Sequence, residues 1–155
     1  MTDHEDNFAQ TLEELLGLLC DINQDIVDCG LSNLEVEETR EMIEFLSVYG
    51  NKELVQEFSS HHEKWTHVKN RSDEFILEHM PNIYPELETQ IVTEPIRVFN
   101  EIGENEAIDQ DKIDIIWSYF DALIRHCCRY IRDNKKEEWC SEIDHEQYID
   151  MFEVK

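Results

Sequence analysis

Residues 109–131 read DQDKIDIIWSYFDALIRHCCRYI and contain the most regular apolar spacing in the chain. The apolar side chains recur every three or four residues, which places them along one face of an α-helix. The positions concerned are Ile113, Ile116, Trp117, Phe120, Leu123, Ile124, Cys127 and Ile131. We therefore expect this segment to form a long amphipathic helix at the centre of the core.

The same spacing occurs upstream in two further stretches. The first, over about residues 5–28, predicts a helix that Gly30 would end as a left-handed C-cap. The second predicts a helix that opens at Asn51 as its N-cap and continues through Leu54, Val55, Phe58, Trp65 and Val68. Between these stretches, N-cap residues and acids predict another helix over about 32–50.

The rest of the chain shows weaker helical patterns. Ser72 opens a short piece closed by Pro81, Pro95 interrupts the spacing over 86–101, and a last amphipathic segment surrounds Ile149. Hairpin turns, sustained alternation and internal repeats are lacking in the sequence. We predict an all-α, single-domain bundle of five to seven amphipathic helices, with a helical domain over 1–138 and a short helical segment over 139–155 that packs on it or binds a partner.

Composition and charge exclude several function classes. The 155 residues are 41% hydrophobic, and 37 Asp and Glu face 13 Lys and Arg, for a net charge of −24. Such a charge repels phosphate backbones and anionic lipid headgroups, so we expect neither direct nucleic-acid nor membrane binding. The first residues lack a secretory pattern, and five cysteines are an odd number, which favours reduced thiols in the cytoplasm or nucleus and not secretion.

Motifs for catalysis or metal binding are weak. The chain has no Gly-x-Ser-x-Gly elbow, and its four glycines form no phosphate loop. His62 and His67 are five apart, whereas two zinc ligands on one helix face are four apart. Glu142-x-x-His145 occurs once, while di-iron bundles need two copies. The remaining soft ligands, His126, Cys127, Cys128, Cys140 and His145, include no Cys-x-x-Cys pair. We expect no catalytic residues, no metal and no cofactor.

Two charged surfaces are candidates for binding a partner. The first is basic, with Trp139 expected to lie exposed beside it, and consists of Arg125, Arg129, Arg132 and Lys136. These cations would either stabilise the end of their helix or dock an acidic partner or a second copy of the chain. The second is an acidic face of the first helix, made of Glu14, Asp21, Asp25 and Asp28. It would either keep the protein soluble or imitate a phosphate backbone.

A resemblance adds a biological context. Ile116-Trp117-Ser118-Tyr119 with Leu123 after it, together with Phe8-x3-Leu12, Leu54-Val55-x2-Phe58, Trp65 and Phe75-Ile76, resembles small all-helical proteins of nucleocytoplasmic large DNA viruses. The resemblance spans about residues 8–131, but the family's usual Phe-Pro pair is missing after Ile22, and the tail from Trp139 is not covered. It implies a viral protein without known enzymatic activity, packaged in the virion or made late in infection.

Two functions follow as expectations. The first is a non-enzymatic, acidic helical interaction protein, a minor structural, virion-associated or accessory component of a large DNA virus that binds capsid or other virion proteins, or itself. The second is an acidic mimic that sequesters a basic nucleic-acid-binding protein. Either would place the protein in the host cytoplasm or nucleus, or in the virion.

Overall fold

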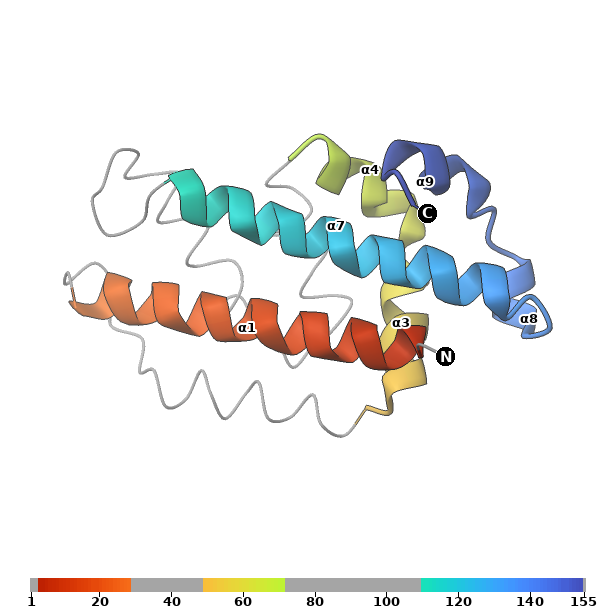
Figure 1. Cartoon of the computed structure of the whole chain (residues 1–155), viewed down its shortest axis with the longest axis horizontal. Helices are drawn as coiled ribbons and strands as arrows, with labels where there is room; N and C mark the ends of the chain where they lie inside the picture. The colour runs from red at the N-terminus through yellow and green to blue at the C-terminus, as the bar shows by residue number, and fades with distance from the viewer. Residues whose placement is uncertain (1–2, 29–48, 72–109, 155) are drawn as a thin grey trace.

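Two long antiparallel helices organise the molecule. The computed structural model describes residues 3–28, 49–71 and 110–154, and in it α1 (His4–Asp28) lies beside α7 (Gln110–Asp133) and runs in the opposite direction (Figure 1). These three ranges hold six α-helices, one 3₁₀ turn and no strand, which confirms the predicted all-α fold. In the same ranges, every helix is too short or too polar to traverse a lipid bilayer.

Five short elements surround this pair. The first three follow one another as α3 (Asn51–Ser59), the 3₁₀ turn η2 (His62–Lys64) and α4 (Trp65–Lys69). Helix α3 packs against both α1 and α7, and α4 packs against α7. The last two, α8 (Glu138–Ser141) and α9 (Glu146–Met151), fold back onto α7.

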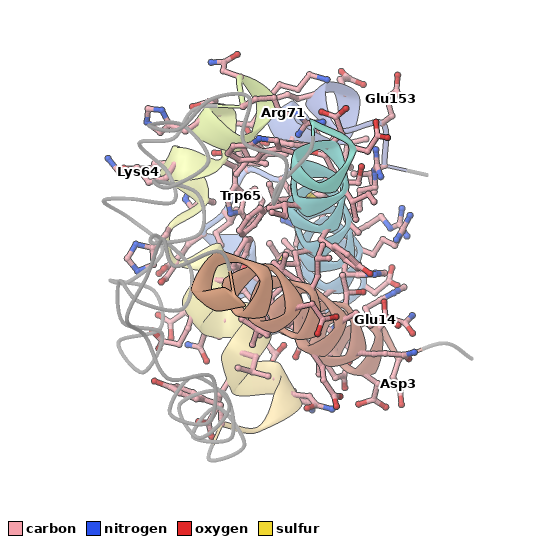
Figure 2. The ribbon with its side chains drawn as sticks, turned by 90° about the vertical axis from the view of Figure 1, so that its left-hand side faces the viewer. Asp3, Glu14, Lys64, Trp65, Arg71 and Glu153 are labelled. Carbon is pink, nitrogen blue, oxygen red and sulfur yellow. The ribbon has the colours of Figure 1, made fainter. Side chains whose placement is uncertain are left out.

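The core lies where these elements meet. Helix α1 contributes Phe8, Leu12, Leu15 and Leu16, and α7 contributes the stripe predicted from the sequence from Ile116 onward; Ile113 has its side chain outside the described residues. Phe8 meets Phe58 of α3 edge to face, with 5.4 Å between ring centroids. Figure 2 shows Trp65 turned inward, whereas Glu14 and Glu153 point outward. Burial of this apolar surface is the main force that stabilises the bundle.

The helix predicted from Asn51 to Val68 is wrong in two respects. Gly50, not Asn51, is the N-cap, and Asn51 is the first helical residue, whose Nδ2 donates to Asp6 Oδ1 at 2.6 Å. The helix also breaks after Ser59, and the chain turns before α4 begins. Ser60 Oγ donates to the Glu57 carbonyl at 2.7 Å, a local bond of the kind that competes with helix continuation.

Several predictions fall on other parts of the chain. The described residues do not include most of the helix predicted over about 32–50 or the C-cap at Gly30. They also leave out the piece ended by Pro81, the piece kinked by Pro95, and the side chains of Leu19, Ile22 and Ile26 in the first helix.

The segment after α7 is packed on the domain. Tyr148 meets Trp65 edge to face at 4.8 Å, and Phe152 is buried. Arg125 Nε donates to the Phe152 carbonyl at 2.7 Å, which ties the end of this segment to the middle of α7. The segment therefore contributes to the core through its own apolar residues.

Candidate functional site

The arginines expected to form a basic docking surface largely serve the fold. Arg125 is half-buried and bound to the Phe152 carbonyl, and Arg129, also half-buried, donates from Nη1 to His126 Nδ1 at 3.3 Å. Arg132 is exposed and donates to Asp133 Oδ1 at 3.4 Å. Two of the three guanidinium groups are therefore engaged in contacts that hold the structure together.

Lys136 and Trp139 lie outside the helix that carries these arginines. Helix α7 ends at Asp133, so Lys136 lies beyond it, exposed in the following turn. Trp139 is half-buried and stacks on Tyr130 with ring centroids 5.7 Å apart and planes 11° apart. Tyr130 lies about 140° around α7 from Arg125. The expectation of an exposed tryptophan beside the basic stripe is therefore wrong, because stacking turns Trp139 toward another face.

The acidic face is placed in part. Glu14 and Asp21 are both exposed on α1, and Gln10 Nε2 donates to Glu14 Oε1 at 3.4 Å (Figure 2). Asp25 and Asp28 belong to the same helix, but their side chains lie outside the described residues. Helical spacing alone puts all four residues on one side of α1.

The cysteines and histidines noted as soft metal ligands are buried or bound elsewhere. Cys127, Cys128 and Cys140 are free and buried, and burial raises the pKa of Cys128 and of Cys140 to about 12 and that of Cys127 well above its ordinary value. Such thiols stay protonated, whereas a metal requires thiolates. In the described part of the chain, no three His, Cys, Asp or Glu side chains are grouped to hold a metal ion.

His126 is fixed between α1 and α7. Because Arg129 donates to Nδ1, the ring proton resides on Nε2, which donates to Thr11 Oγ1 at 3.2 Å. Burial, and secondly the charge of Arg129, lowers the pKa of His126 to about 4. The ring is therefore neutral near neutral pH and links the two long helices.

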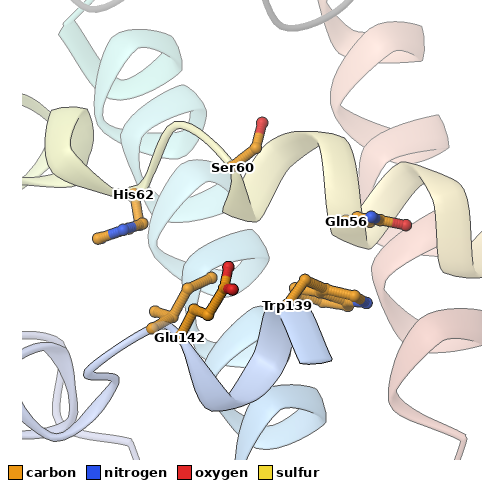
Figure 3. A pocket seen from close by; sticks show the side chains of 6 residues that line it. Gln56, Ser60, His62, Trp139 and Glu142 are labelled. Carbon is orange, nitrogen blue, oxygen red and sulfur yellow. The ribbon is translucent and has the colours of Figure 1, made fainter. Parts of the chain in front are cut away.

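An open pocket separates α3 from α8. It has a volume of about 320 Å³ and is lined by Gln56, Ser60, His62, Trp139, Glu142 and Ile143 (Figure 3). Gln56 and Ser60 are four residues apart at the end of α3, and Trp139 and Glu142 are three apart at α8, so each pair faces the same side of its helix. The pocket thus has an aromatic and aliphatic wall and a polar rim.

Hydrogen bonds within the fold hold Ser60 and His62 in place at the pocket. The Ser60 hydroxyl donates a hydrogen bond to the Glu57 carbonyl. Tyr148 Oη donates to the His62 carbonyl at 2.8 Å, so it accepts from His62 Nδ1 at 2.9 Å. The Glu142 carboxylate is exposed and accepts only. A ligand that pairs with Glu142 must therefore donate hydrogen bonds.

The sequence did not reveal this pocket. The spacing Trp139-x-x-Glu142 is a usable signal, because it puts an aromatic ring and a carboxylate on one helix face. The opposite wall comes from α3, about 80 residues away in the chain, and only the fold brings the two together.

Comparisons with known proteins add no identity. No protein-family model matches the chain, and no curated protein or solved structure shows a significant match to it.

Proposed function

We propose that this protein is a non-enzymatic, acidic helical interaction protein that binds a basic protein partner. The observation that carries the proposal is the unequal use of the two charge types. Many cations bind within the fold: Arg71 pairs with Asp121, Arg125 and Arg129 are engaged as described above, and Lys135 Nζ donates to the Cys140 and Ile143 carbonyls, both at 3.2 Å.

The acids, in contrast, face solvent. Exposed carboxylates occur on all of the described elements except α4, among them Glu14, Asp21, Glu53, Glu57, Glu63, Asp114, Glu138, Glu142, Asp144, Glu146 and Asp150. With a net charge of −24, this surface creates a strong negative potential. Such a potential attracts basic proteins, speeds their association and repels acidic ones.

This arrangement favours an acidic binder over a protein that docks through its arginines. Arg125 and Arg129 are half-buried and already donate to the Phe152 carbonyl and to His126, so a partner would have only their remaining N–H groups. A basic nucleic-acid-binding protein has the complementary charge, and sequestering such a protein is the role that we propose. The virion-associated or accessory role and the host location implied by the resemblance are compatible with this partner class.

Binding of a basic peptide tests the proposal. The full chain would be titrated into a fluorescent peptide rich in arginine and lysine, and into a control peptide with citrulline and acetyl-lysine in their place, while anisotropy is measured. We expect binding of the basic peptide alone, weakening between about 0.05 M and about 0.5 M NaCl because salt screens exposed charges. Equal affinity for both peptides, or no affinity for either, would overturn the proposal.

Competition with DNA tests the more specific role. A basic DNA-binding domain would be held on labelled duplex DNA, and the protein would be added. We expect the DNA to be released, because the acidic surface and the DNA bind the same basic groove. Formation of a ternary complex without release would exclude sequestration of the groove.

A further inference from the structure

The pocket between α3 and α8 presents a rigid aromatic wall. Trp139 stacks on Tyr130, whose hydroxyl donates to Glu137 Oε2 at 2.7 Å, so the ring behind the indole is itself held in place. The indole also lines the pocket, as Figure 3 shows. A fixed indole face attracts a cation through its ring electrons, and arginine stacks on such faces particularly well.

A carboxylate without a cation stands beside this wall. Glu142 lies three residues after Trp139 and is exposed. Among the described residues, none makes an ion pair or a hydrogen bond with its carboxylate. The unpaired carboxylate beside the indole makes the pocket electrostatically suited to a cation that brings several N–H groups.

The two carboxylate oxygens of Glu142 favour arginine over lysine as the cation in the pocket. A guanidinium offers five N–H donors in a flat fork that matches both oxygens of a carboxylate, whereas an ammonium offers three donors around a point. Glu142 offers both carboxylate oxygens to such a fork, and Gln56, Ser60 and His62 line the pocket beside it. A volume of about 320 Å³ lies at the small end of ligand sites, which suits one side chain.

We infer that this pocket binds an arginine side chain of the basic partner, with the guanidinium packed on Trp139 and paired with Glu142. The inference deepens the proposed function and rests on it: the acidic surface attracts the partner, and the pocket recognises one residue of it. Arginine in an extended segment of the partner would enter from the open side of the pocket.

Two variants with the same change in charge separate the pocket from the general acidity. Glu142→Gln removes the carboxylate of the pocket, and Glu146→Gln removes an equally exposed carboxylate on neighbouring α9 that does not line it. Their thermal unfolding would be compared with that of the unmodified protein to verify folding. Each protein would then be titrated with an arginine-rich peptide and with a lysine-rich peptide of the same length and charge.

We expect the unmodified protein to prefer the arginine peptide, and Glu142→Gln to weaken its binding about tenfold, the usual cost of losing one charged hydrogen-bond pair. Glu146→Gln should change it less than about twofold, as a distant screened charge does. In NMR spectra, the indole N–H signal of Trp139, assigned through Trp139→Phe, should shift with the arginine peptide and not with NaCl.

The alternative outcomes are distinct. Equal losses in both variants, equal affinity for both peptides and an unmoved Trp139 signal would reject the arginine pocket but leave the acidic binder intact. If neither peptide binds the unmodified protein, both proposals are rejected.

Discussion

Arg71 Nη1 and Nη2 donate to the two carboxylate oxygens of Asp121 at 2.8 and 2.7 Å, which joins the turn after α4 to the middle of α7. The guanidinium also lies 5.8 Å from the ring centroid of Trp117. The hydrogen bond with Asp121 raises the pKa of Arg71, which keeps the guanidinium charged. Arg71 keeps this position although its φ of 54° is unusual for a residue with a side chain.

Replacing Arg71 with Lys should lower the free energy of unfolding by about 1 kcal/mol, because lysine cannot form the paired contact or stack as well on Trp117. Chemical denaturation would measure the change. A double-mutant cycle with Asp121→Asn supplies the control, and additive effects of the two substitutions would contradict a direct coupling.

Gly17→Ala should stabilise the protein by about 0.5–1 kcal/mol, because Ala restricts the unfolded chain and favours helix. Gly17 is exposed within α1, and among the described residues no heavy atom lies within 4 Å of a Cβ built there. Gly50→Ala is the opposite case, since Gly50 is the N-cap of α3, where alanine is the poorer residue by a few tenths of a kcal/mol. We expect the melting temperature to rise in Gly17→Ala and to fall in Gly50→Ala, and a shift of both variants in the same direction would contradict this expectation.

Arg125→Gln should loosen the segment after α7, because it weakens the bond to the Phe152 carbonyl. Limited proteolysis followed by mass spectrometry would detect faster cleavage beyond Glu142. Arg132→Gln is the matched control, since Arg132 is exposed and pairs with its neighbour Asp133 at 3.4 Å. Identical cleavage rates would show that the segment is held by its apolar residues alone.

Cys127, Cys128 and Cys140 should resist alkylation in the folded protein. Burial shields them, and their raised pKa values leave almost no thiolate at mildly alkaline pH. Iodoacetamide labelling with peptide mapping would show modification of these residues only after a denaturant is added. Rapid native labelling of any of the three would mean that its helix opens readily.

Acid should destabilise the protein through His126. Its pKa is about 4 in the folded chain and 6.5 in the unfolded chain, so the unfolded state binds more protons between these values. The stabilisation is complete above pH 6.5 and is lost as the pH falls through about 4. Melting temperatures of His126→Gln should therefore decline less over this window than those of the unmodified protein, while parallel declines would assign the acid sensitivity to other groups.

The two long helices were predictable because each has an uninterrupted apolar stripe. A stripe of that length fits the helical spacing of three or four residues and does not fit the two-residue alternation of a strand. The break after Ser59 was not, since Phe58 and Trp65 are seven residues apart, which is also the spacing of two helical turns. No glycine or proline marks the turn. The competing signal was the run of Ser59, Ser60 and His61, which has weak helix propensity.

The candidate site was harder to predict than the fold. The charge spacing of Arg125, Arg129 and Arg132 is a correct reading of α7, but it does not show that the Phe152 carbonyl and His126 use two of these side chains. Likewise, Trp139 reads as a surface residue until Tyr130 is seen to stack on it. Contacts between distant segments determine where both side chains lie, and such contacts cannot be predicted from the local sequence.

The pairing of α1 with α7 has a consequence for synthesis of the chain. The bonds that join the two helices, His4 to Asp133 and Thr11 to His126, span 129 and 115 residues. A ribosome must therefore complete most of the polypeptide before Phe8, Leu12 and Leu15 can meet their partners on α7. Contacts this remote slow folding relative to bundles of sequential hairpins. Nascent chains that stall before residue 110 would keep the contacts of α3 with α1 but lack those of α7, and the apolar surface left exposed on α1 makes them targets for chaperones.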